Sequence, residues 1–311
     1  MSALPGAHPA ARHRPRRGWR GASSVRSWGL ASAGPIVAFL VLAFAISWGW
    51  SFTLVANGDI VHRGVGWPTA APASFGPAIA AVLVMAWFSG HVGLADLARR
   101  IVRWRFALRC WAAALSPLAF LGIGLGVAAL TGNLPNASDF GRYNGWPLVG
   151  IGGAALAALL GGFGEEAGWR GFALPAFQRR VGAKRAALIV AGFWALWHLP
   201  YFFLVSSYRG FGPFTLVGFT IGIAAGSVVL TWVYYGSGQS ILAVAVWHAA
   251  YDMATFGSSG TIQALVSMLV IAQAIVLLRL HHRALKHGSH PVLGPPEETR
   301  PTVAGTVATR A

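Results

Sequence analysis

The sequence predicts an all-helical, polytopic integral membrane protein with about eight transmembrane helices. The prediction rests first on composition: of the 311 residues, 55% are hydrophobic and only 10% are charged. It rests also on apolar segments long enough to cross a bilayer, which recur along most of the chain. Finally, the basic residues lie between these segments, as topology determinants do. A soluble globular domain is therefore excluded.

Each predicted span is an apolar segment of roughly 18–23 residues, the length that crosses a bilayer as a helix. The eight segments cover approximately residues 34–56, 72–90, 110–131, 147–166, 186–204, 214–235, 239–256 and 261–280. The fourth is expected to continue past residue 166, because the sequence stays apolar up to Pro175. Proline lacks a backbone N–H donor and interrupts a helix.

The two ends of the chain differ in composition from the spans. Residues 1–28 are rich in Arg, Pro, Gly and Ser, and we expect a disordered basic arm. Residues 284–311 are expected to form a disordered C-terminal tail, because Pro, Gly and Thr are frequent there. The helical transmembrane domain is thus expected to occupy residues 29–283.

The distribution of Lys and Arg predicts that both termini are cytoplasmic. In this orientation 21 of the 24 basic residues lie on the inner side, and Arg63, Arg142 and Arg209 lie outside. Such an excess of inner positive charge sets the topology of membrane proteins. We expect an integral protein of a bacterial-type plasma membrane, surrounded by the lipid bilayer.

The net charge of +16 follows from this same distribution. The sequence has no basic groove or nucleic-acid-binding module, so no nucleic acid is expected as a partner. The single cysteine, Cys110, allows no internal disulfide.

Few ionisable side chains fall within the predicted spans. Of the eight acidic residues only Glu165, Glu166 and Asp252 do, and of the ten histidines only His198 and His248. An ionised group at the bilayer centre costs about 2.5–3.5 kcal/mol on insertion scales, so such residues indicate a functional site.

The hairpin between the fourth and fifth spans brings some of these side chains to a similar depth. Its tip is the polar run 178–185; Glu165 lies 13 residues before it and His198 lies 13 residues after it. In helices both would lie roughly 20 Å from the tip at 1.5 Å per residue. His248 lies about nine residues from the cytoplasmic end of the seventh span. We therefore expect one cavity, opening to the cytoplasm.

Helical spacing also predicts local pairs. Glu166 and Arg170 are i,i+4 neighbours and are expected to form an ion pair. His248 and Asp252 have the same spacing, so the carboxylate can hold the imidazole in one tautomer. Glu165 points about 100° away from Glu166 around the helix, toward the expected cavity.

Three motifs in this region resemble those of a known family. They read EEAGWR (165–170), WALWH (194–198) and HAAYD (248–252). They are similar to the EExxxR, FxxxH and HxxxN/D motifs of the CAAX prenyl protease and bacteriocin-processing family of intramembrane proteases. The resemblance covers roughly residues 70–256, with a protease core at about 110–256.

The resemblance implies an intramembrane endopeptidase that hydrolyses a peptide bond near the cytoplasmic face of the membrane. Its partner would be a peptide or protein substrate presented at the membrane. Glu165 would be the general base, and His198 would help to position and activate a water. His248 and Asp252 would stabilise the oxyanion. Three further residues would hold the shape of the site: Glu166, Arg170 and Trp194.

The sequence departs from the family pattern at two positions. Trp194 stands where the second motif has Phe. Asp252 ends the third motif where Asn is the alternative, and an ionised Asp cannot donate a hydrogen bond to an oxyanion. Either Asp252 is protonated, or it orients His248, which then donates; we favour the second interpretation.

Alternative functions follow from the same residues. Glu165, His198 and His248 could supply three ligands to zinc or another divalent metal, although the chain has no H-E-x-x-H helix. A non-catalytic immunity or scaffold protein on the same fold is a second alternative, which the retention of every candidate catalytic position disfavours. A proton-coupled transporter would be expected to contain inverted repeats, and the sequence has none.

Overall fold

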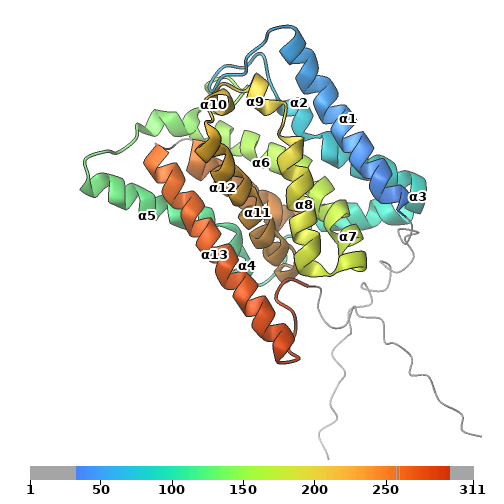
Figure 1. Ribbon diagram of the computed structural model, residues 1–311. Coiled ribbons are helices and arrows are strands. Elements are labelled where there is room, and N and C mark those ends of the chain that lie inside the picture. Colours follow the sequence, from blue (N-terminus) through green and yellow to red (C-terminus); the bar gives the residue numbers. More distant parts are fainter. Residues whose placement is uncertain (1–32, 257, 259, 295–311) are drawn as a thin grey trace, which may run out of the picture.

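The computed structural model describes residues 33–256, 258 and 260–294, and this part of the chain is helical (Figure 1). Its elements in chain order are α1 (Gly34–Ala56), α2 (Ala71–Ser74), α3 (Gly76–Ile101), α4 (Leu108–Ala114), α5 (Ser116–Leu130), the 3-10 helix η2 (Ala137–Gly141), α6 (Gly150–Gly168), the π-helix η3 (Trp169–Ala173), α7 (Leu174–Val181), α8 (Ala183–Trp197), α9 (Tyr201–Leu204), α10 (Ser206–Arg209), α11 (Pro213–Gly236), α12 (Ile241–Phe256) and α13 (Gly260–Lys286). The all-helical prediction is confirmed.

Each predicted span corresponds to helical structure. However, fewer than eight helices in the described part of the chain are long and apolar enough to cross a membrane. Among the described residues, 5 helices are long and apolar enough to cross a membrane, or up to 6 if α4 and α5, bent by 52°, form one span. The helices of the predicted fourth and seventh spans, α6 and α12, are not among them. Helix α12 has only 16 residues, and α6 carries two glutamates. The count of eight therefore stays a prediction.

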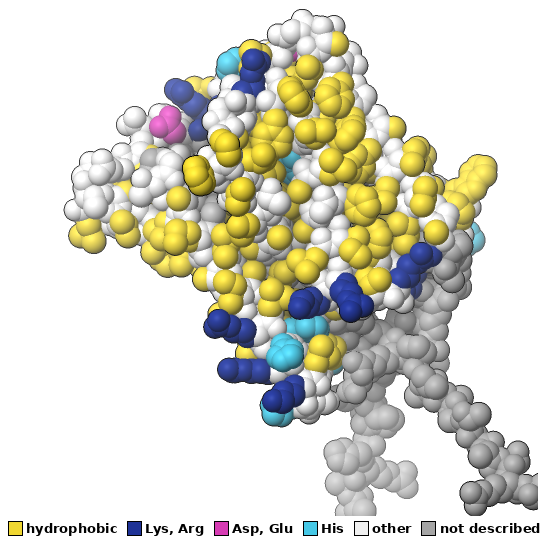
Figure 2. Space-filling view, in the orientation of Figure 1, with side chains coloured by type: hydrophobic (Ala, Val, Ile, Leu, Met, Phe, Trp, Pro, Cys, Tyr) yellow, Lys and Arg dark blue, Asp and Glu magenta, His cyan; other side chains and the backbone are white. Residues whose placement is uncertain are grey.

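The surface has the charge distribution of a membrane protein. Figure 2 shows a broad hydrophobic belt, with Lys, Arg and His side chains gathered below it near the end of α13. The side of the membrane that this basic end faces stays a prediction.

The C-terminal segment differs from the expected disordered tail. Helix α13 continues to Lys286, and Leu293 is fully buried in the main hydrophobic core. The backbone N–H of Leu293 donates to Nδ1 of His281 at 3.3 Å, and His281 is buried as well. The start of the tail is therefore folded because it packs on the helices. The rest of the predicted tail, and the predicted arm 1–28, lie outside the described residues.

Helix α6, which carries the two glutamates, packs mainly on α12 and α3. In Figure 1, α8, α11 and α12 stand side by side in front of it. Glycines permit these close contacts. A Cβ atom at Gly162 would lie 3.0 Å from the carbonyl oxygen of Ala245 in α12, and one at Gly164 would lie 2.5 Å from that of Ser74 in α2. The glycines before the glutamates thus serve helix packing.

The helix that carries Glu165 and Glu166 changes its winding directly after them. Residues Trp169–Ala173 form a π-helix, and Pro175 is the second residue of α7, so the helix continues past the proline at which we expected an interruption. In an α-helix the N–H of residue 175 would bond to the carbonyl of Gly171, but proline has none. Nη1 of Arg100 donates to that carbonyl instead, at 2.7 Å.

Arg100 belongs to a second buried polar cluster, which the sequence did not reveal. Nη2 of Arg100 lies 2.9 Å from Oδ2 of Asp96, and Nη1 also donates to the hydroxyl of Tyr234 at 2.7 Å. Asp96 is buried, although it lies outside the predicted spans. The reason is that α3 extends through residue 101 and its last turns pack against the bundle.

Candidate active site

An ion-pair network centred on Glu166 forms the inner part of the site. Glu166 and Arg170 are completely buried, and Oε1 of Glu166 lies 2.9 Å from Nη1 of Arg170. The same oxygen lies 2.9 Å from Nδ1 of His248. The predicted Glu166–Arg170 pair is therefore present. Glu166 also connects α6 to α12, which helical spacing alone could not predict.

Glu165 points toward α8, where it meets Trp194. Nε1 of Trp194 donates a hydrogen bond of 2.7 Å to Oε2 of Glu165, and both residues are buried. The guanidinium of Arg170 lies 4.6 Å from the centroid of the Trp194 ring, a distance typical of a cation–π contact. The rings of His198 and His248 lie 5.8 and 5.5 Å from the same indole. Trp194 thus contacts four of the predicted site residues.

His198 follows the last residue of α8 and is held by the backbone. Its Nδ1 lies 2.7 Å from the carbonyl oxygen of Trp194. A carbonyl oxygen only accepts, so Nδ1 carries the proton and Nε2 keeps its lone pair in the neutral ring. The other ring contacts of His198 are with Trp197, Tyr201, Tyr208 and Phe219.

Asp252 contacts a residue that the sequence analysis missed. The hydroxyl of Tyr143 donates to Oδ2 of Asp252 at 2.8 Å. Burial, and after it the neighbouring charge of Asp252, raise the pKa of Tyr143 well above its usual value. The hydroxyl therefore stays protonated and serves as a donor. Tyr143 lies in the loop before α6, and 109 residues separate it from Asp252, so no spacing rule indicates this contact.

The contact between Asp252 and His248 is longer than we expected. Oδ1 of Asp252 lies 3.9 Å from Nε2 of His248, beyond hydrogen-bonding distance. The hydrogen bond that fixes the imidazole comes from Glu166 on the opposite ring nitrogen. Asp252 thus faces the ring nitrogen that remains free.

Solvent exposure divides these residues into two groups. Glu166 and Arg170 are 0% exposed, whereas Glu165 is 7%, His198 6% and His248 7% exposed. The first pair therefore forms part of the protein interior. The other three side chains keep a small accessible surface, where a substrate could contact them.

The described residues do not offer a metal site. No group of three or more His, Cys, Asp and Glu side chains among them is arranged to hold a metal ion. The alternative ligand set Glu165, His198 and His248 is therefore not gathered to fit a metal in this conformation.

Comparison with known proteins concerns the part of the chain that carries these residues. The family model described as "Type II CAAX prenyl endopeptidase Rce1-like" matches residues 146–254. By this similarity, residues 146–254 form an Rce1-like domain. The Rce1-like domain contains every site residue from Glu165 to Asp252, whereas Tyr143, Asp96 and Arg100 lie outside it.

One curated relative is informative within the same family. The "CAAX prenyl protease 2" of Methanococcus maripaludis is 32% identical over 94 residues, which are 29% of this chain and 35% of that protein. The match thus spans about a third of the length of the relative.

Proposed function

We propose that this protein is an intramembrane endopeptidase that hydrolyses a peptide bond with a water activated by Glu165 and His198. The observation that carries the proposal is that Trp194 hydrogen-bonds one carboxylate oxygen of Glu165 and one ring nitrogen of His198. The second polar atom of each side chain is left available. The indole N–H of Trp194 occupies Oε2 of Glu165, and its carbonyl occupies Nδ1 of His198. Oε1 of Glu165 and Nε2 of His198 remain as two acceptors for the two hydrogens of one water.

The chemistry follows from these two acceptors. Glu165 takes a proton from the water while the water oxygen adds to the carbonyl carbon of the substrate. His198, which accepts the second hydrogen through Nε2, fixes the orientation of the water. When the tetrahedral intermediate collapses, the C–N bond breaks and Glu165 returns the proton to the leaving nitrogen. Both groups are buried, so bulk water competes little for them.

His248 is the residue that we propose as donor to the oxyanion. Its Nδ1–H bonds to Glu166, so donation from Nε2 requires the doubly protonated ring. Two carboxylates flank the ring, with Oε1 of Glu166 2.9 Å from Nδ1 and Oδ1 of Asp252 3.9 Å from Nε2, and negative charge at both nitrogens favours this cation. Asp252 and its Tyr143 partner then act on His248 through charge, whereas the hydrogen bond that orients the ring comes from Glu166 and not, as we favoured from the sequence, from Asp252.

The substrate that we propose is a peptide or protein presented at the membrane, cleaved on the cytoplasmic side. The aromatic residues around His198 come from α9, α10 and α11. They cover the site on the side opposite the basic end of α13. This arrangement favours entry from the basic end, which the charge distribution assigns to the cytoplasm.

Cysteine labelling tests this orientation. In a Cys110→Ala background, Lys184→Cys and Arg209→Cys place single thiols at two exposed positions at opposite ends of the helices. An impermeant thiol reagent should label residue 184 only from the cytoplasmic side and residue 209 only from outside. Labelling of both positions from the same side would overturn the proposed orientation.

The proposed activity is tested by comparing the peptides released in membranes that contain the wild type or Glu165→Gln. The variant keeps volume and can still accept from Trp194, but it lacks a base, so released fragments should disappear at equal membrane levels of protein. Asp59→Asn, which removes a carboxylate far from the motifs, is the matched control and should retain cleavage. Identical fragments from the wild type and Glu165→Gln would favour a non-catalytic immunity or scaffold protein.

A further inference from the structure

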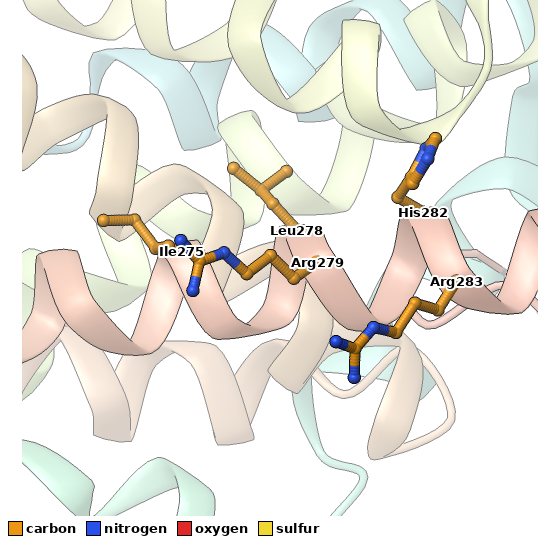
Figure 3. Close-up of a pocket in the computed structure, with 5 residues that line it drawn as sticks. All are labelled: Ile275, Leu278, Arg279, His282 and Arg283. Carbon is orange, nitrogen blue, oxygen red and sulfur yellow. The ribbon is translucent and has the colours of Figure 1, made fainter.

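The basic end of α13 carries a groove that is separate from the candidate active site. It has a volume of about 310 Å³ and is lined by Ile275, Leu278, Arg279, His282 and Arg283. These residues recur every three to four positions, so they share one face of the helix. Figure 3 shows the side chains of Arg279 and Arg283 lying along α13 in the direction of Ile275, with Leu278 and His282 on the other edge.

The groove is apolar at one end and basic at the other. Ile275 is 45% exposed, and α13 is among the helices that are long and apolar enough to cross a membrane. An exposed isoleucine in such a helix faces lipid chains. Arg279, His282 and Arg283 follow within two turns toward the C-terminal end of the helix. This polarity matches that of a phospholipid, with its chains toward the membrane centre.

The two arginines present two exposed cationic groups that can bind an anion. Among the residues that the structure describes, neither Arg279 nor Arg283 lies in an ion pair. Arg279 lies one turn, about 6 Å, closer to the membrane centre than Arg283 at 1.5 Å per residue. Guanidinium groups bind phosphate oxygens through paired N–H donors, and basic residues at a helix end attract anionic lipids.

We propose that this groove binds the headgroup of an anionic phospholipid. Its phosphate lies between Arg279 and Arg283, His282 adds a hydrogen bond, and an acyl chain follows Ile275 and Leu278. General anchoring of a helix by positive charge would require no particular lipid, whereas this groove should bind selectively and to saturation. None of these residues belongs to the active site, so the inference does not depend on the proposed protease activity.

The test is a lipid titration of the purified full chain in phosphatidylcholine bicelles, with retained phosphatidylglycerol measured by native mass spectrometry. We expect one tightly retained phosphatidylglycerol on the wild type. The double variant Arg279→Gln/Arg283→Gln should weaken its retention by roughly tenfold or more, since each basic residue near a membrane surface contributes about 1 kcal/mol to anionic lipid binding. The charge-preserving variant Arg279→Lys/Arg283→Lys should lose part of it.

The matched control is Lys184→Gln/Lys286→Gln, which removes equal charge from exposed positions outside the groove. It should retain phosphatidylglycerol like the wild type. Equal weakening by the control, or no weakening by the glutamine double variant, would overturn the proposal. Competition by millimolar inorganic phosphate would also do so, because it would identify a free-anion site. If the glutamine variant does not fold, the lysine variant decides: retention at the wild-type level, or a loss no greater than that of the control, would overturn the proposal.

Discussion

The contact between Trp194 and Glu165 makes a sharp prediction about catalysis. Trp194→Phe keeps an aromatic ring, and Phe is the residue of the family pattern, but it removes the indole N–H that donates to Oε2 of Glu165 at 2.7 Å. A hydrogen bond to a charged group contributes about 1.5–3 kcal/mol. A loss of 1.4 kcal/mol corresponds to about tenfold in rate, so kcat should fall by roughly 10–100-fold. The Michaelis constant should change little, because the bond positions the base rather than the substrate.

The assay is cleavage of a peptide identified by the Glu165→Gln comparison, measured as kcat and KM with protein in the same lipid. Trp247→Phe is the matched control: Trp247 is also buried, but its indole N–H has no hydrogen-bond partner among the described residues. This control should keep kcat. The reasoning is refuted if Trp194→Phe turns over at the wild-type rate, or if both tryptophan variants lose activity equally.

The remaining predictions concern the residues around Trp194. Glu166→Gln should lower the unfolding free energy by about 3–5 kcal/mol, because it leaves Arg170 buried without its charged partner; folded yield and thermal unfolding measure this, and a normally stable variant contradicts the bracing role. Asp252→Asn should remain active with a shifted pH–rate profile, because it removes a charge facing His248 while Tyr143 can still donate to it; an unchanged profile excludes an effect of this charge on His248. Asp252→Ala should lose about 10²–10³ in rate if residue 252 is needed at the oxyanion, and an active variant removes it from the site. Tyr143→Phe should reproduce part of the Asp252→Ala loss, and the double variant should then be less than additive.

Helical spacing predicted which site residues are neighbours on one helix, but it could not predict the hydrogen bonds between helices. The Glu166–Arg170 pair follows from i,i+4 spacing and is present at 2.9 Å. The same spacing predicted a contact of His248 with Asp252, yet the hydrogen bond to the ring comes from Glu166 in another helix. Spacing identifies neighbours on one helix surface, whereas the rotation of one helix against another depends on the packing of all its side chains.

The contacts of two further residues, Asp96 and Trp194, could not be predicted from the sequence. Asp96 lies outside the predicted second span, which ended near residue 90, but α3 continues and buries it beside Arg100. Trp194 was noted only as a departure from the family pattern, and no spacing rule predicts its hydrogen bond to Glu165. Both contacts pair a polar side chain with a partner that only the folded chain brings near. The second could have been suspected, because a buried indole N–H usually finds an acceptor.

The bond from Arg100 to the Gly171 carbonyl has a consequence for evolution and for protein engineering. Pro175 cannot donate the α-helical hydrogen bond to this carbonyl and Arg100 does donate to it, so we expect a proline within the Rce1-like domain to depend on an arginine that precedes that domain by more than forty residues. The two positions should therefore change together between relatives. A chimaera that joins this domain to the first helices of another protein should fail unless it also imports Arg100 or exchanges Pro175 for a residue with an N–H. We therefore expect that residues 146–254 cannot be transferred alone to another protein, because their folding also requires a residue that precedes them.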